Sequence, residues 1–303
     1  MNVPRELYPF AGRYLDIGGH RLHTIDEGSG SPVVMVHGNP SWSFYYRNLA
    51  RALRDRHRVI VPDHIGCGFS DKPSLDDYPY TLERRVSDFS EAMACLDPGD
   101  EITLVVHDWG GMIGLAWAVE HPARVKRIVL LNTAAFPMPS TKKMPWTLGL
   151  VRNTRAGAWL VLRFNAFCRG ATRMAVTRRP MPPEVRKAYC APYDNVANRI
   201  ATLRFVQDIP LRPSDPSWKI VEETAGKLER FNNTPVLVCW GAKDFVFDDH
   251  FLAEWRQRWP HAVVHRFEDC GHYILEDAME EVVGRVRGFI QDHPVPVEAR
   301  GCN

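Results

Sequence analysis

The stretch Val105-Val106-His107-Asp108-Trp109-Gly110-Gly111 is the part of the sequence that decides the fold. It closes a short β-branched apolar run, Ile102 to Val106, which is typical of a buried strand. It precedes Met112 to Glu120, whose composition predicts a helix that ends at His121-Pro122. The two glycines allow that helix to begin close against the strand. We therefore predict a sharp strand-to-helix turn with Asp108 at its tip and backbone N–H groups directed at its side chain.

An aspartate at the tip of such a turn has a different chemistry from the serine that usually occupies it. Its carboxylate is already ionised at neutral pH, whereas a serine hydroxyl needs a base before it can act as a nucleophile. A carboxylate nucleophile suits attack on a carbon atom that carries a leaving group. The simpler alternative is that Asp108 only caps the following helix, because aspartate is a common N-cap residue.

Size and composition are those of an ordinary globular protein. The chain has 303 residues, of which 45% are hydrophobic and 24% are charged, and this is enough for one large α/β domain with an insertion. The formal net charge is +2, basic and acidic residues are interspersed, and basic runs are no longer than pairs such as Arg178-Arg179. We therefore expect no nucleic acid and no other polyanion as a partner.

The sequence predicts a protein without an integral membrane segment, a metal or a cofactor. Its amino-terminal residues lack the apolar core of a secretory signal, and no uninterrupted apolar run reaches membrane-spanning length. We therefore expect a soluble, cytoplasmic protein. The 7 cysteines are scattered and include no Cys-x-x-Cys, so neither a disulfide framework nor a zinc site is indicated.

Apolar strand-like runs recur along the chain with helical stretches between them, which predicts a parallel sheet. Ahead of them, two runs separated by Gly18-Gly19 predict a hairpin that adds antiparallel strands at one edge. The expected fold class is therefore α/β, with a mostly parallel twisted sheet flanked by helices. The hairpin runs are Arg13 to Ile17 and Arg21 to Glu27, and the later runs are Pro32 to Val36, Val59 to Pro62, Ile102 to Val106, Ile128 to Leu131, Pro235 to Trp240 and Val263 to Phe267.

The segment between Asn132 and Pro235 is far longer than the roughly dozen residues of an ordinary crossover connection. It contains an apolar helical run, Ala158 to Phe167, then a second helix, and it ends in the loop Asp208 to Trp218. We interpret it as a helical cap inserted over the carboxyl edge of the sheet. The predicted division is a first core part at 1–134, the cap at 135–222 and a second core part at 223–303.

Reactive and polar side chains follow four of the predicted strands directly. In an open α/β sheet, ligands bind outside the carboxyl ends of the strands, so these side chains are expected to meet. Along the chain the order is nucleophile, acid, histidine, which is the order of the α/β-hydrolase arrangement. The four places are His37-Gly38-Asn39-Pro40, Asp108-Trp109, Gly241-Ala242-Lys243-Asp244 and Gly271-His272.

On these four motifs the chain resembles the α/β-hydrolase family, and within it the haloalkane dehalogenase group, over nearly its whole length. The resemblance implies that Asp108 is the nucleophile, His272 the general base and Asp244 the acid that orients it. It also implies that Asn39 and Trp109 bind the leaving anion, and their backbone N–H groups form the predicted oxyanion hole.

The identity of the acid leaves some alternatives. One subgroup of the family places the acid after the preceding strand, where this chain has Asn132, an amide that cannot do that job. Asp244 is therefore the first choice, and Asp248 and Asp249 are weaker candidates.

Within the group, the chain looks most like the β-lactone decarboxylases of bacterial long-chain olefin biosynthesis. The segments that carry this likeness are His37 to Arg47, Ala197 to Leu211 and Asp244 to Asp248. The resemblance implies conversion of a cis-3,4-dialkyl β-lactone, a hydrophobic small molecule, into a cis-alkene and CO₂. It also implies a β-lactone synthetase as a protein partner. In the predicted cap, we expect Trp146, Leu148, Trp159 and Phe164 to contact the substrate, although a cap must also bury one apolar face on the core.

Three alternative functions remain open on the sequence. Hydrolysis of 1-haloalkanes to alcohols and halide needs the same residues and is the runner-up. Hydrolysis of epoxides needs two cap tyrosines as proton donors; the candidates are Tyr189 and Tyr193, but Pro192 between them argues against a regular helix. A non-catalytic receptor that keeps the fold is the third alternative, and intact Asp108, Asp244 and His272 argue against it.

Overall fold

The computed structural model describes residues 3–295 and contains one eight-stranded sheet in the order β1-β2-β4-β3-β5-β6-β7-β8. The hairpin β1–β2 is antiparallel and pairs antiparallel with β4, and the remaining pairs are all parallel. The predicted mostly parallel sheet with an antiparallel edge is therefore confirmed. The strands are β1 (Arg13–Ile17), β2 (His20–Glu27), β3 (Pro32–Val36), β4 (Arg58–Pro62), β5 (Ile102–Asp108), β6 (Val125–Thr133), β7 (Val236–Gly241) and β8 (Val263–Phe267).

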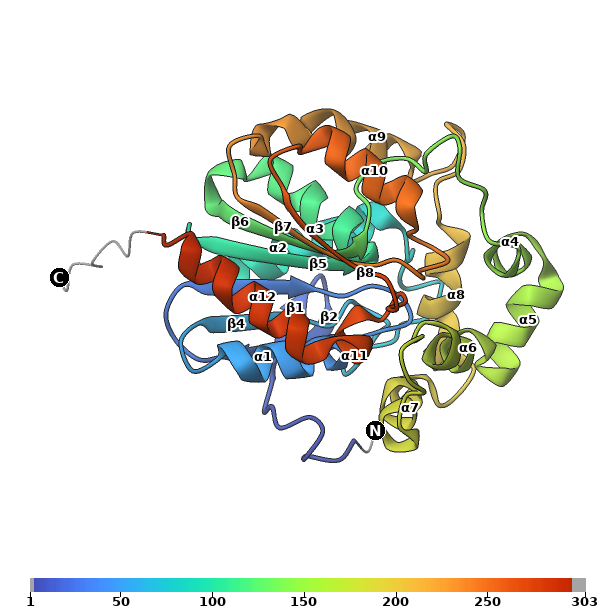
Figure 1. Ribbon diagram of the computed structural model, residues 1–303. Helices are drawn as coiled ribbons and strands as arrows, with labels where there is room; N and C mark the ends of the chain where they lie inside the picture. The colour runs from blue at the N-terminus through green and yellow to red at the C-terminus, as the bar shows by residue number, and fades with distance from the viewer. Residues whose placement is uncertain (1–2, 296–303) are drawn as a thin grey trace.

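Helices cover both faces of the sheet, and this explains why the central strands are apolar throughout (Figure 1). In β3, Val34 and Val36 face a core shared with α2, α3, α9 and α10, while Val33 and Met35 face a second core shared with α1 and α12. Successive strand side chains point to opposite faces, so both sets are buried. These helices are α1 (Arg47–Leu53), α2 (Leu82–Leu96), α3 (Trp109–Glu120), α9 (Trp218–Lys227), α10 (Asp249–Arg258), α11 (Ile274–Asp277) and α12 (Met279–Asp292), with short 3-10 turns η1 (Ser43–Tyr46), η2 (Pro122–Arg124) and η5 (Leu228–Phe231).

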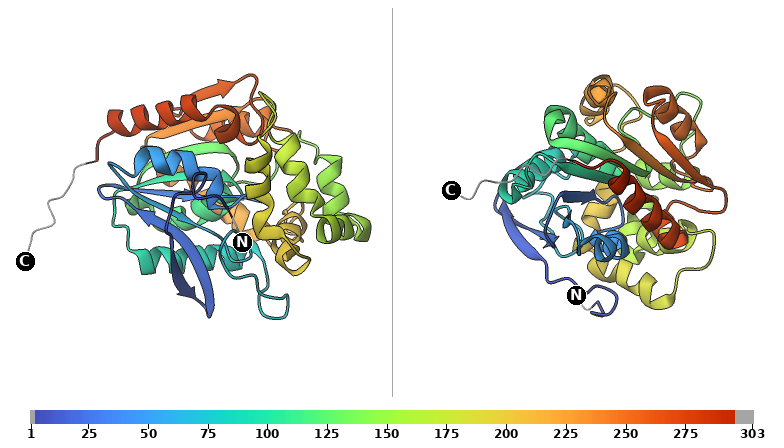
Figure 2. Two further views of the ribbon diagram at one scale, coloured as in Figure 1. Left: turned by 90° about the horizontal axis from the view of Figure 1, so that it is seen from below. Right: turned by 60° about the vertical axis from the view of Figure 1, so that its left-hand side comes forward.

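The described part of the chain has five further helices. They gather at one end of the sheet, as the left view of Figure 2 shows. They follow β6 in the chain and lie beyond the carboxyl ends of the parallel strands (Figure 1). Because α9 packs on α3 and Val221 belongs to the core, we propose that the cap ends before Trp218. The cap helices are α4 (Trp146–Asn153), α5 (Arg155–Phe164), α6 (Ala166–Met174), α7 (Pro183–Cys190) and α8 (Ile200–Gln207), with η3 (Ala191–Tyr193) and η4 (Ala197–Arg199) between the last two.

The single helix expected over Ala158 to Phe167 is wrong, because the chain breaks at Asn165 into α5 and α6. Asn165 adopts a left-handed conformation with φ of 54°, which asparagine tolerates better than most residues. Its Nδ2 donates a hydrogen bond to the Tyr193 carbonyl at 3.1 Å, a partner far along the sequence.

Candidate active site

Asp108 lies at the tip of the predicted turn, with φ of 51° and ψ of −126°. This conformation is strained for a residue with a Cβ, and the surrounding structure holds it. Thr133 Oγ1 donates a 2.5 Å hydrogen bond to the Asp108 carbonyl, and a Cβ added to Gly110 would collide with the Val36 carbonyl. The helix begins at Trp109 rather than Met112, and the Asp108 side chain makes no capping bond to it. The interpretation of Asp108 as a mere cap is therefore wrong.

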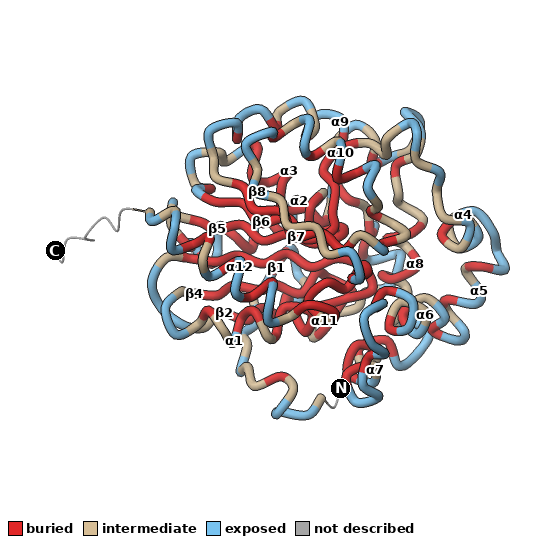
Figure 3. Tube along the Cα trace, in the orientation of Figure 1, coloured by how far each residue is buried: buried red, intermediate tan, exposed pale blue. Residues whose placement is uncertain are grey.

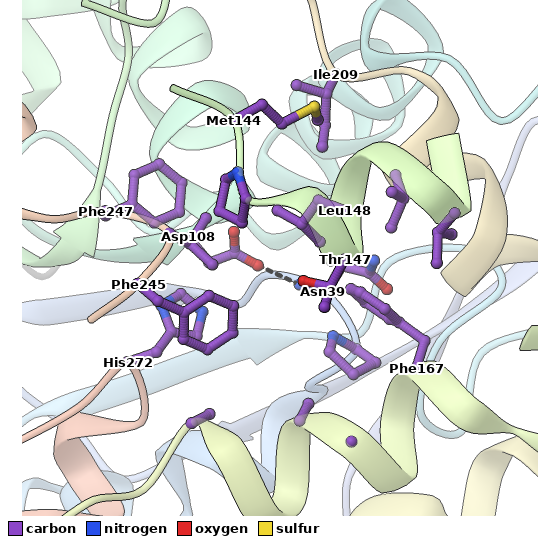
Figure 4. A pocket seen from close by; sticks show the side chains of 18 of the residues that line it. Asn39, Asp108, Met144, Thr147, Leu148, Phe167, Ile209, Phe245, Phe247 and His272 are labelled. Carbon is purple, nitrogen blue, oxygen red and sulfur yellow. Dashed lines mark hydrogen bonds between the residues drawn. The ribbon is translucent and has the colours of Figure 1, made fainter. Parts of the chain in front are cut away.

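The Asp108 carboxylate is buried but opens onto a cavity. Its Oδ2 accepts a 2.6 Å hydrogen bond from the backbone N–H of Asn39, the dashed line in Figure 4. Burial raises the pKa of Asp108 to about 6; the charge of Asp244 adds to the rise, and His272 and the N–H groups of Asn39 and Trp109 oppose it. At pH 7 the carboxylate is mostly ionised, in surroundings that make it a better nucleophile than one in water.

His272 and Asp244 form a buried pair beside this carboxylate. His272 Nδ1 lies 2.7 Å from Asp244 Oδ2, and Asp244 Oδ1 accepts a 2.7 Å bond from the Val246 N–H. With Nδ1–H donated to Asp244, His272 presents Nε2 to the cavity that it lines. Burial alone would lower the pKa of His272, but the charge and hydrogen bond of Asp244, with the charge of Asp108, raise it above its ordinary value.

The other candidate acids lie elsewhere. Asp248 caps α10 and pairs with Lys142 at 2.6 Å, and Asp249 pairs with Arg266. Asn132 ties the ends of two strands together, because its Nδ2 donates to the Gly241 carbonyl and its Oδ1 accepts from the Gly241 N–H. The geometry therefore favours Asp244 as the partner of His272.

Asn39 and Trp109 both border the cavity at the Asp108 carboxylate. The Asn39 side chain is fixed because its Nδ2 donates one hydrogen bond to the Thr202 carbonyl at 3.0 Å. Within residues 3–295, the second N–H of that amide has no hydrogen-bond partner. The Trp109 ring packs against Phe205 on α8 with ring centroids 5.3 Å apart, so the cap helps to position it.

The cavity has a volume of about 290 Å³, and almost all of its wall is apolar. Figure 4 shows Asp108 and His272 at one side of it, facing cap residues such as Leu148 and Phe167. Such a cavity with few polar groups suits a hydrophobic substrate. Its apolar wall includes Met112, Phe136, Met138, Met144, Trp146, Leu148, Leu150, Val151, Leu160, Val161, Phe167, Met174, Val206, Ile209, Phe245, Val246, Phe247 and Phe251.

Two of the four cap residues expected at the substrate are in the wall, namely Trp146 and Leu148. Trp159 and Phe164 are not among the lining residues; they are 57% and 47% exposed and pack against each other on the outside of α5, with ring centroids 4.9 Å apart. Leu160 and Val161 line the cavity instead. Neighbouring residues on a helix point in different directions, so the orientation of α5 decides which of its apolar residues face the cavity.

Sequence reasoning missed Lys142 and His107. Lys142 is a cation in the apolar wall, held by Asp248 and by the Phe245 carbonyl at 3.0 Å. His107 lies one residue before Asp108, and its Nε2–H donates to the His272 carbonyl at 2.9 Å. Burial, together with the charge of His272, holds the pKa of His107 well below its usual value. Only its position beside Asp108 signals a role in the sequence.

The two tyrosines that an epoxide hydrolase would need are directed away from the cavity. Tyr189 donates to Glu276 Oε1 at 2.6 Å, and Tyr193 donates to the Ser41 carbonyl at 3.3 Å. Neither is among the cavity-lining residues, and α7 ends before Pro192 as that proline predicts. The arrangement therefore does not favour epoxide chemistry.

The chain belongs to the alpha/beta hydrolase fold family, whose sequence model matches residues 31–278. Two relatives are named cis-3-alkyl-4-alkyloxetan-2-one decarboxylase. The one from Shewanella oneidensis is 54% identical over 94% of this chain and 90% of its own length, and the one from Xanthomonas campestris pv. campestris is 49% identical over 95% and 98%. A mutant of the haloalkane dehalogenase DatA from Agrobacterium tumefaciens superposes with a TM-score of 0.84 at 25% identity, over 92% of this chain and 96% of that one.

Within residues 3–295, none of the helices has the length and apolar composition needed to cross a membrane.

Proposed function

We propose that this protein decarboxylates cis-3,4-dialkyl β-lactones to cis-alkenes and CO₂. The observation that carries the proposal is the Asp108 carboxylate, buried at the side of an apolar cavity beside the His272–Asp244 pair. An oxetan-2-one is a β-lactone, so the names of the two relatives favour this substrate over a haloalkane. The apolar wall suits two alkyl chains.

In one route Asp108 attacks the ring carbon that carries the alkyl oxygen. The C–O bond breaks, an ester to Asp108 forms, and the leaving group is a carboxylate that stays attached to the neighbouring carbon. The Trp109 indole N–H and the second N–H of the Asn39 amide are the donors that would receive that carboxylate. Its bond to the neighbouring carbon then breaks, the electron pair forms the alkene, and Asp108 leaves as a carboxylate. No water is consumed.

In a second route Asp108 attacks the lactone carbonyl and forms a mixed anhydride, with the ring oxygen leaving as an alkoxide. The backbone N–H groups of Asn39 and Trp109 would then stabilise the tetrahedral oxyanion. The alkoxide would then attack the Asp108 acyl carbon of the anhydride and release the substrate carboxylate. This leaves an ester of Asp108, from which CO₂ and the Asp108 carboxylate depart as in the first route. The two routes therefore differ in the atom to which Asp108 is bonded in the first intermediate.

The role of His272 differs between haloalkane hydrolysis and lactone decarboxylation. An ester of Asp108 from a haloalkane must be hydrolysed, so neutral His272 has to take a proton from water, with Asp244 stabilising the imidazolium. Decarboxylation needs no such water. The raised pKa of His272 favours the imidazolium, whose charge stabilises the anions that form beside it.

The test is turnover of a synthetic cis-3,4-dialkyl β-lactone by the purified protein, with the alkene measured by gas chromatography. We expect cis-alkene and CO₂ in equal amounts, and a covalent adduct on the Asp108 peptide when the reaction is quenched early. Rapid turnover of 1-bromoalkanes with no reaction of the lactone would refute the proposal.

Haloalkane hydrolysis is the second candidate, because Trp109 and Asn39 border the carboxylate where a halide would leave. Halide release from a panel of 1-bromoalkanes tests it.

By resemblance we also propose that the protein acts in olefinic hydrocarbon biosynthesis beside a β-lactone synthetase. Co-purification of the two proteins from the native cell tests that association.

A further inference from the structure

The overall charge of +2 conceals a strong separation of charge along the chain. Residues 135–222 contain 15 Lys and Arg but 5 Asp and Glu, a formal charge of +10, so the remaining residues carry −8. No acidic residue occurs between Glu120 and Glu184, which includes all of α4, α5 and α6. The expectation that polyanions are excluded rested on evenly mixed charges, and the cap does not have them.

Among the cations on and next to these three helices, Lys142 and Arg152 are paired with Asp248 and Asp215. Five others are exposed, and none of these five has an ion-pair partner among residues 3–295: Lys143, Arg155, Arg163, Arg169 and Arg173. Basic side chains of a structural network are normally paired with carboxylates. A group of unpaired positive side chains instead creates an electric field that attracts an anionic surface.

Large apolar side chains are exposed among these cations. Six of the ten exposed large hydrophobic residues in the described part of the chain lie on α4, α5 and α6: Trp146, Leu150, Trp159, Leu160, Phe164 and Met174. Trp146 is 78% exposed. Figure 3 shows these helices at the outer end of the molecule, with exposed stretches along each of them. Helices that combine Trp, Phe and Leu with Arg are typical of segments that lie in a membrane interface.

We propose that the outer surface of α4, α5 and α6 binds an anionic phospholipid bilayer. The cations would contact lipid phosphates, and Trp146, Trp159 and Phe164 would enter the boundary between headgroups and acyl chains. Charge complementarity favours a bilayer over a second copy of this chain, because two copies of the surface would oppose each other with the same sign. This binding does not depend on which substrate the active site takes.

The same surface borders the opening of the active-site cavity. Trp146, Leu150, Leu160 and Met174 are exposed and also line the cavity. A protein bound by this surface therefore places an apolar passage against the acyl region of the bilayer. Apolar molecules dissolved in lipid would reach Asp108 through it without crossing water.

The experiment is sedimentation of the full-length protein with sucrose-loaded vesicles. One set contains phosphatidylcholine alone, and the other also contains phosphatidylglycerol. We expect binding at least about tenfold tighter to the anionic vesicles, weakened by salt. The double variant Arg155→Glu, Arg163→Glu should lower that affinity by about tenfold or more, because it reverses two charges on α5.

The matched control is the double variant Arg51→Glu, Lys126→Glu. It makes the same change in net charge with exposed side chains on α1 and at the start of β6, away from the cap. It should retain vesicle affinity within about twofold, and thermal unfolding of each variant verifies that it is folded. A second pair, Trp159→Ala with Phe164→Ala, should weaken binding to anionic vesicles without changing the salt dependence.

Equal binding to both kinds of vesicle would overturn the proposal. So would an equal loss in the control and in the α5 charge variant. Sedimentation velocity adds a third outcome: a dimer that Trp159→Ala with Phe164→Ala dissociates, together with no vesicle binding, would assign the surface to a second copy instead. Lactone turnover in detergent is measured separately, so failure of the proposed reaction does not affect this result.

Discussion

At the residue scale, the raised pKa of Asp108 makes a prediction about pH. Asp108, the proposed nucleophile, must be ionised, and its pKa is about 6 instead of the usual 3.8. We expect kcat/KM for the proposed substrate to fall about tenfold per pH unit as the pH drops below about 6. A profile measured from pH 5 to 8 tests this. A rate that stays constant down to pH 5 would show that Asp108 has an ordinary pKa or is not the nucleophile.

Replacing Asp108 is expected to abolish activity but to increase stability. Asp108→Asn removes the proposed nucleophile but keeps the shape and an acceptor for the Asn39 N–H. Because the folded-state pKa lies above the unfolded one, the ionised carboxylate destabilises the fold at pH above 6, and this cost disappears below the unfolded value near pH 4. We expect no turnover and a free energy of unfolding higher by about 2 kcal/mol at pH 8, with a smaller difference at pH 5. Urea titrations at the two pH values measure it.

His107 is expected to act as a positioning residue for His272. Its Nε2–H holds the backbone carbonyl of His272, and the two rings are 4.6 Å apart between centroids. His107→Leu removes this donor, and we expect kcat to fall roughly 10- to 100-fold, since small misplacements of catalytic groups are costly. His107→Gln keeps an N–H donor and should restore most of the rate. If Leu and Gln variants were equally impaired, with unchanged pH profiles, the hydrogen bond would have no such role.

At the element scale, the strands were predictable and the cap was less so. β1, β3 and β8 begin and end where apolar runs and turn residues place them. Each of these elements depends on its own residues and on burial by neighbours of the same pattern. The break between α5 and α6 depends instead on a hydrogen bond from Asn165 to Tyr193, which no local pattern contains.

That break can be tested by substitution of Asn165. Asn165→Ala places a Cβ in the left-handed region without the asparagine hydrogen bond, and we expect a loss of about 2–3 kcal/mol in the free energy of unfolding. Asn165→Gly loses the hydrogen bond but tolerates the conformation, so about 1 kcal/mol is expected. Chemical denaturation of both variants gives the comparison. Equal losses would mean that backbone conformation is not important at this position.

The candidate site was predictable where it depends on the ends of strands. Asp108, Asp244 and His272 come together because each follows a parallel strand directly, and the sheet places those ends along one edge. The walls of the cavity were harder to predict. Trp159 and Phe164 are as apolar as Leu160 and Val161, and only the orientation of α5 decides which pair faces inward.

At the scale of the whole molecule, a hydrogen-bond network around one buried ion pair joins the cap to the core. Glu276 of α11 binds Arg47 of α1 through both carboxylate oxygens and accepts the Tyr189 hydroxyl of α7 at 2.6 Å. Arg47 also lies over the Phe44 ring at 4.1 Å. All three polar groups are nearly buried, so the network is sensitive to the loss of any one member.

Glu276→Gln leaves the buried guanidinium of Arg47 without its counter-charge, and we expect a loss of about 3–5 kcal/mol in the free energy of unfolding. Tyr189→Phe removes one hydrogen bond and should cost about 1–2 kcal/mol. Calorimetry of the two variants distinguishes them. A Glu276→Gln protein as stable as Tyr189→Phe would mean that water already compensates Arg47.

The separation of +10 in residues 135–222 from −8 in the rest gives the molecule a large permanent electric dipole, although its total charge is almost zero. A protein with such a dipole is oriented by the electric field of a charged surface before it touches that surface. It would adsorb on cation-exchange and anion-exchange resins alike, by opposite poles. Encounters in solution therefore have a preferred orientation. The basic end of the molecule reaches an acidic partner first, and this end contains the opening of the cavity that leads to Asp108.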